Sequence, residues 1–102
     1  MLELPQKKAE QAILECLDRG LSSIGESSRQ ALYWHVEHTY GVKRDDIPTH
    51  PDKFQASLES LFGVGAKILV RSIEAEISSV FKISGKWPTL EHAIKGALES
   101  GA

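Results

Sequence analysis

The sequence predicts an all-α protein, a compact bundle of about five helices that we expect to form a dimer. Apolar residues recur at helical spacing along most of the chain, and no segment shows the period-two alternation of a half-buried strand. Glycines and prolines divide the chain into pieces of ordinary helix length. With 102 residues the chain is expected to be a single domain, residues 1–102, with one modest core.

The first two helices are predicted from their apolar faces and from the glycines that follow them. One is expected from about Leu4 to Arg19, with Gly20 as its left-handed stop. The next is expected from about Glu26 to Tyr40, and Gly41 ends it in the same way.

A connector and a proline mark the third helix. The stretch GVKRDDIPTHPDKF is expected to be a connector up to Pro51, which suits the first position of a helix over about Pro51 to Phe62. Gly63 is then predicted to end this helix with a positive φ. Gly65 is predicted to let the following helix begin close to a neighbour.

The fourth helix has the strongest periodicity, and we expect it to be the central helix of the core. Its apolar stripe is formed by Ala66, Leu69, Val70, Ile73, Ile77, Val80 and Phe81. The fifth helix is predicted over about residues 89–100, with Thr89 as its N-cap and Gly101 at its end.

Charge and composition disfavour several classes of function. The net charge of −2 argues against nucleic acid as the default partner, although Arg29, Lys43, Arg44 and Lys53 could gather locally. The chain has no apolar run of about 18 residues and no signal-peptide pattern. One cysteine cannot form an internal disulfide, which suits a cytoplasmic protein.

The paired glycines do not fit a nucleotide loop. A dinucleotide fingerprint needs a third glycine where this chain has Ile68, and a Walker loop needs a different spacing before Lys67. A weaker hypothesis is that free amides at the start of the fourth helix, around Gly63 and Gly65, hold an anion beside Lys67.

No complete catalytic constellation is present, so we expect a non-enzymatic protein without a cofactor. His35 and His38 lie three residues apart on a helix and could share a metal, but surface or boundary histidines are the favoured interpretation. Cys16 lies on the apolar face of the first helix, which favours a packed, inert thiol.

Two kinds of contact surface are expected. Tyr33 and Trp34 straddle the edge of an apolar stripe and mark a possible partner surface, although the tryptophans could equally cap the ends of the core; for Trp87 the cap is favoured. Self-association is expected through the fourth and fifth helices, unless the fourth is simply buried within one chain. The residues expected in that contact are Leu69, Ile73, Ile77, Val80, Phe81, Ile94 and Leu98.

Four stretches of the chain carry a family resemblance. They are the helix ALYWHVEHTYG, the connector DDIPTHPDKF, the joint LESLFGVGAK and the helix that follows, together about Ile24 to Phe81. Here the chain resembles the archaeal Nitrosopumilus output domain family, fifth type, although Val70 stands where that family is expected to have an acidic residue. The resemblance implies a small helical output module of archaeal signalling, here free-standing, and it implies no catalytic residues.

The resulting hypothesis is a cytoplasmic, non-enzymatic signalling or interaction module that binds itself and a further protein. The alternative is a regulatory domain that binds a small ligand or metal through His35, His38 and the joint from Gly63 to Lys67. DNA binding is the third interpretation.

Overall fold

Five α-helices form the described part of the chain, which comprises residues 4–82 and 90–100 of a computed structural model. These residues contain no strand, so the predicted all-α class is confirmed. Trp87, Thr89 and Gly101 lie outside the described residues. The elements are α1 (Leu4–Gly20), η1 (Ser22–Ile24), α2 (Glu26–Tyr40), η2 (Arg44–Thr49), α3 (Pro51–Phe62), η3 (Gly63–Gly65), α4 (Ala66–Phe81) and α5 (Leu90–Ser100), where η marks a 3₁₀ turn.

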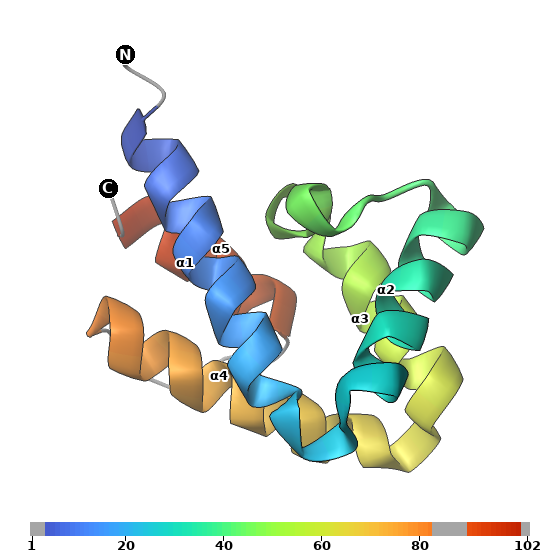
Figure 1. The fold of residues 1–102 in the computed structure, drawn as a ribbon. Helices are drawn as coiled ribbons and strands as arrows, with labels where there is room; N and C mark the ends of the chain where they lie inside the picture. The colour runs from blue at the N-terminus through green and yellow to red at the C-terminus, as the bar shows by residue number, and fades with distance from the viewer. Residues whose placement is uncertain (1–3, 83–89, 101–102) are drawn as a thin grey trace.

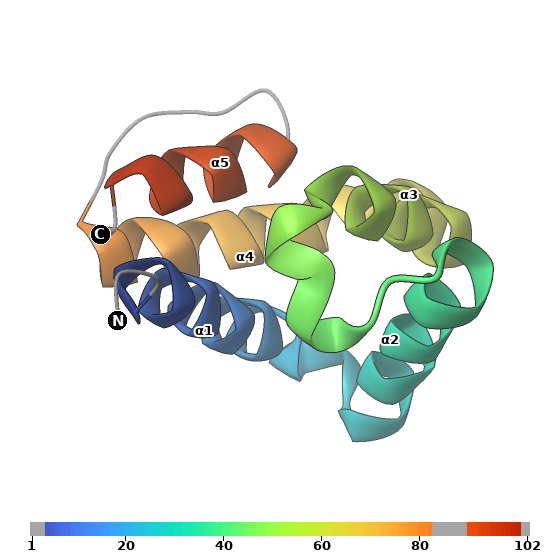
Figure 2. The same ribbon diagram turned by 90° about the horizontal axis from the view of Figure 1, so that it is seen from above.

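The helices form two groups that share one core. Helix α4 runs between α1 and α5 (Figure 2), and all three contact one another. Helices α2 and α3 contact each other and cross at the opposite end from the chain termini (Figure 1). The turn η2 packs on α1 and thereby ties the two groups together.

All five helices and the turn η2 contribute side chains to a single apolar core. Each helix places residues three or four apart on its inner face, as an amphipathic helix requires. The largest fully buried side chains are Phe54, Ile13, Leu17, Leu21, Leu32, Ile47, Leu58, Ile73, Ile77, Leu90, Ile94 and Val36. Burial of Ile47 and Pro48 explains why the predicted connector coils into a 3₁₀ turn: these two side chains are needed in the core.

Two of the predicted helix stops are confirmed. Gly41 ends α2 in the left-handed conformation, with φ 72° and ψ 22°, and its amide donates to the Glu37 carbonyl oxygen at 2.8 Å. Gly63 ends α3 with φ 56° and ψ −129°, a backbone conformation that side chains disfavour.

The roles predicted for Gly20 and Gly65 are wrong. Gly20 continues α1 without a positive φ, and the positive φ occurs instead at Gly25, after η1, with φ 87° and ψ 164°. A Cβ on Gly20 would lie 2.5 Å from Ile73 Cγ1 and 2.8 Å from Ile73 Cα, so Gly20 is where two helices approach closely. Gly65 adopts helical angles, φ −67° and ψ −18°, and a Cβ there would meet no atom within 4 Å.

Alanine at Gly20 and at Gly65 should therefore change stability in opposite directions. We expect Gly20→Ala to lower the free energy of unfolding by about 1–3 kcal/mol or more, because the Ile73 backbone cannot move aside without separating α1 from α4. Gly65→Ala should raise it by about 0.4–1 kcal/mol, because alanine restricts the unfolded chain. Urea unfolding followed by circular dichroism measures both, and equal effects of the two variants would contradict the assignment.

Alanine at Gly63 tests backbone strain alone. No atom lies within 4 Å of a Cβ built there, so the cost arises only from the positive φ. We expect Gly63→Ala to reduce the free energy of unfolding by about 1–2 kcal/mol. The same urea titration checks this, and a neutral effect would show that the turn relaxes without cost.

Candidate functional site

An aromatic pair is exposed on the outer face of α2. The Trp34 side chain is 59% exposed, and its ring stacks on that of His38 with centroids 4.0 Å apart. The Nδ1 atom of His38 lies 2.9 Å from the Trp34 carbonyl oxygen, which can only accept, so Nδ1 carries the proton. The stack holds the indole in place without covering its outer face.

The Tyr33 side chain, unlike that of Trp34, takes part in a group of polar contacts with Asp18 and Arg44. Its hydroxyl donates to Asp18 Oδ1 on α1 at 2.6 Å, and Arg44 Nη2 on η2 donates to Asp18 Oδ2 at 2.6 Å. The Arg44 guanidinium also lies over the Tyr33 ring, 5.7 Å from its centroid. The half-buried Tyr33 thus uses its hydroxyl to join α1, α2 and η2, and its part in the predicted partner surface stays a prediction.

The two histidines of the predicted pair, His35 and His38, contact different partners. His35 Nδ1 lies 3.0 Å from the hydroxyl of the buried Ser57 on α3, whereas His38 bonds its own helix. Over residues 4–82 and 90–100 no three His, Cys, Asp or Glu side chains are grouped so that they could hold a metal ion. The structure thus gives His35 a packing contact between α2 and α3.

The joint between α3 and α4 exposes apolar side chains. Val64 is 92% and Ile68 67% exposed, and they lie one helical turn apart because Gly65 and Ala66 already have helical angles. Leu61, in the last turn of α3, is 44% exposed. Sequence periodicity missed Val64 and Ile68 because both lie off the apolar stripe of α4. An apolar residue that falls outside the stripe of its helix is the sequence signal that could have identified them.

At the same joint, backbone amides that the predicted anion site needs are already hydrogen-bonded within the chain. The amide of Gly63 donates to the Glu59 carbonyl oxygen, and that of Ala66 donates to the carbonyl oxygens of the 3₁₀ turn. These bonds engage amides that the site at Gly63, Gly65 and Lys67 would require. Lys67 itself is exposed.

Most of the residues predicted for self-contact lie inside the core. Leu69, Ile73, Ile77 and Ile94 are 5% exposed or less, so their assignment to a contact between copies is wrong for this fold. The residues that remain at the surface are Val80, 42% exposed, and the half-buried Phe81 and Leu98. Helix α4 buries its stripe against α1, α3 and α5 of its own chain.

Three of the four cations proposed for DNA binding are paired with carboxylates. Arg29 contacts Glu26 and Asp18, Arg44 contacts Asp18 and Asp45, and Lys53 lies 3.5 Å from Asp52. Paired cations release fewer counterions on meeting phosphates, which weakens this interpretation further.

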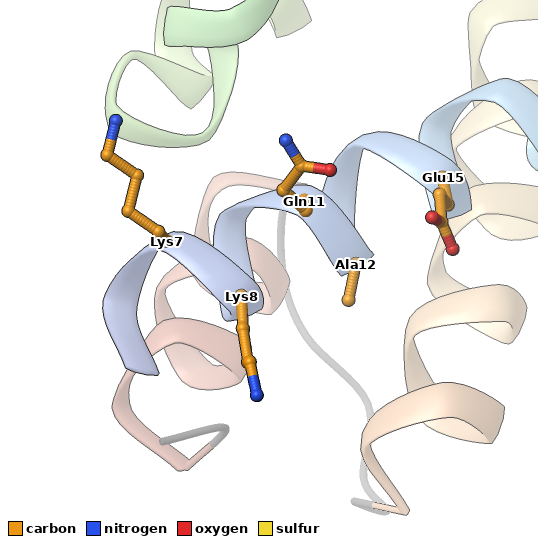
Figure 3. A pocket seen from close by; sticks show the side chains of 5 residues that line it. All are labelled: Lys7, Lys8, Gln11, Ala12 and Glu15. Carbon is orange, nitrogen blue, oxygen red and sulfur yellow. The ribbon is translucent and has the colours of Figure 1, made fainter. Parts of the chain in front are cut away.

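A depression lies along α1. The described residues that line it all come from one helix: Lys7, Lys8, Gln11, Ala12 and Glu15. Lys7 and Lys8 extend in opposite directions (Figure 3), so their ammonium groups do not converge on a ligand.

Two further predictions concern the thiol and the membrane. Cys16 is fully buried, and burial raises the pKa of its thiol, which keeps it protonated and unreactive. Among the helices of the described residues, none is both long enough and apolar enough to span a bilayer.

Comparison with protein-family models, curated proteins and solved structures gives no match for this chain. The resemblance of residues 24–81 to the archaeal output domain therefore stays a prediction.

Removal of the Tyr33 hydroxyl should have a pH-dependent effect. Burial, and then the hydrogen bond to Asp18, raise the pKa of Tyr33 well above its ordinary value. At neutral pH we expect Tyr33→Phe to cost about 1–2 kcal/mol of unfolding free energy, because the bond to the carboxylate is lost. Above pH ~10 tyrosine ionises in the unfolded chain but not in the fold, so the wild type loses stability that the variant does not.

The difference between wild type and Tyr33→Phe should thus narrow as the pH rises above about 10. Urea titrations at neutral and alkaline pH measure it. Tyr40→Phe is the matched control at neutral pH, since the Tyr40 hydroxyl forms no hydrogen bond within the described residues. A difference for Tyr33→Phe that is constant across this range would contradict the raised pKa.

Proposed function

We propose that this protein is a non-enzymatic interaction module that binds other proteins, including copies of itself, through exposed apolar side chains of α2 and of the α3–α4 joint. The observation that carries the proposal is the exposure of Trp34, Val64 and Ile68, at 59, 92 and 67%. Large apolar side chains that are left in water at helix surfaces are typical of protein contact sites, where aromatic anchors contribute most of the affinity.

The surroundings of these side chains support the same proposal. Stacking on His38 fixes the indole of Trp34, and Gly63 and Gly65 flank Val64 in a hydrogen-bonded turn. Preorganised anchors lose less conformational freedom on binding. The resemblance to the archaeal output domain would make such a module a signalling component in the cytoplasm.

Affinity capture with paired surface variants tests the proposed function. Immobilised wild type, a Val64→Asp/Ile68→Asp variant and a Lys8→Asp control on α1 are each exposed to extract of the source organism. We expect at least one protein to be retained by the wild type and the control but reduced about tenfold or more on the double variant, because carboxylates cannot be desolvated against an apolar partner. Identical retention on all three would contradict the proposal.

A further inference from the structure

Charge is segregated between two outward faces of this chain. The exposed residues of α2 include Glu37, which is unpaired within the described residues, and Glu26, which pairs with the half-buried Arg29, but no lysine or arginine. This acidic face consists of Glu26, Ser27, Gln30, Ala31, Trp34, Glu37, His38, Thr39 and Tyr40. From Gly63 to Lys82 the exposed residues include three cations, whereas the two carboxylates of α4, Glu74 and Glu76, are half-buried and Glu76 pairs with Arg19 of α1. This basic face consists of Gly63, Val64, Lys67, Ile68, Arg71, Ala75, Ser79, Val80 and Lys82.

Each face combines its charge with an exposed apolar anchor one turn or less away. On α2, Glu37 follows Trp34 by three residues. On α4, Lys67 and Arg71 flank Ile68, and Val64 lies one turn before it. Residues at these spacings share one side of a helix, so a single helix crossing presents charge and anchor together.

The charged side chains stand at unfavourable ends of their helices. Lys67 lies in the first turn of α4, at the positive end of the helix dipole, and Arg71 repels it from one turn further on. Glu37 lies in the last turn of α2, at the negative end. Within the described residues neither the Lys67 nor the Glu37 side chain forms a hydrogen bond or an ion pair that would offset this cost.

We propose that the acidic face of α2 in one copy binds the basic face of α4 in a second copy, with Glu37 against Lys67 and Arg71, and Trp34 against Val64 and Ile68. This contact would bring together a helix C-terminus and a helix N-terminus, so the dipoles as well as the side-chain charges are complementary. The indole face meets aliphatic side chains beside a guanidinium, a favourable cation–π arrangement. Since every copy has both faces, the contact can form twice around a two-fold axis.

This inference rests on the proposed function and names one partner for its surfaces. It differs from a contact between two copies of α4, which would oppose Lys67 and Arg71 to their own equivalents. It differs also from a contact with an unrelated acidic partner, in which Glu37 would have no role.

Sedimentation equilibrium of charge-reversed variants, over micromolar to millimolar concentration, tests the inference. The wild type should sediment above the 11.2 kDa of one chain. Glu37→Lys and Lys67→Glu should each weaken association about tenfold. Because Arg71 also faces position 37 in the proposed contact, the rescue must reverse both cations: the triple variant Glu37→Lys/Lys67→Glu/Arg71→Glu should recover to within about threefold of wild type. Lys8→Glu, an exposed cation on α1, is the matched control and should leave association unchanged.

Several results would overturn the inference. A wild type that remains monomeric at millimolar concentration excludes the contact; if it still captures a protein through Val64 and Ile68, the proposed function stands alone. Stronger association of Lys67→Glu, with no effect of Glu37→Lys, identifies a contact between two α4 faces. A triple variant as weak as Glu37→Lys alone shows that these charges do not meet. Circular dichroism confirms that each variant is folded, which the exposure of Glu37, Lys67 and Arg71 predicts.

Discussion

Helices α1 and α4 can lie against each other only because Gly20 has no side chain. The position of a Cβ at this residue is already occupied by Ile73, whose backbone and side chain approach within 2.9 Å of it. This approach lets the stripe of α4 be covered by α1 on one side while α5 covers the other (Figure 2). It also brings the C-terminal end of α1 to the place where Asp18 binds Tyr33 and Arg44, so the second helical group is held in position from the same point.

The dependence on this contact explains which parts of the fold could be predicted from sequence. The bounds of α2, α3 and α4 follow from local signals, namely Gly41, Pro51 and Gly63, each of which acts on its own backbone. Gly20 carries the same local signal, yet its role is set by Ile73, more than fifty residues away in the chain. At Gly65 the local pattern suggested a close approach that does not occur, since no neighbouring atom lies within 4 Å of a Cβ built there. The residues next to Gly20 and Gly65 in the sequence do not indicate which of the two glycines lies at a close approach between helices.

The contact surface was harder to predict for a related physical reason. Periodicity finds the apolar stripe of α4 through residues such as Ile73 and Ile77, but it does not say whether the cover comes from the same chain or from another. In the fold that cover is α1, α3 and α5, and only Val80 of the stripe is well exposed. The informative residues were the exceptions to the stripe. Ile68 lies on the opposite side of α4, and the pattern that identifies a core residue necessarily sets it aside.

Apolar residues that lie outside the apolar stripe add no stability to the isolated chain, and charges at the wrong end of a helix reduce it. Exposed Val64 and Ile68 gain nothing from folding, and Lys67 opposes both the dipole of α4 and the charge of Arg71. Glu37 bears a similar cost at the far end of α2. A surface selected for solubility alone would intersperse its charges and place each at the favourable end of its helix. The two faces instead have opposite charge and matching apolar anchors, so the cost borne by each face in the isolated chain is relieved by contact with the other.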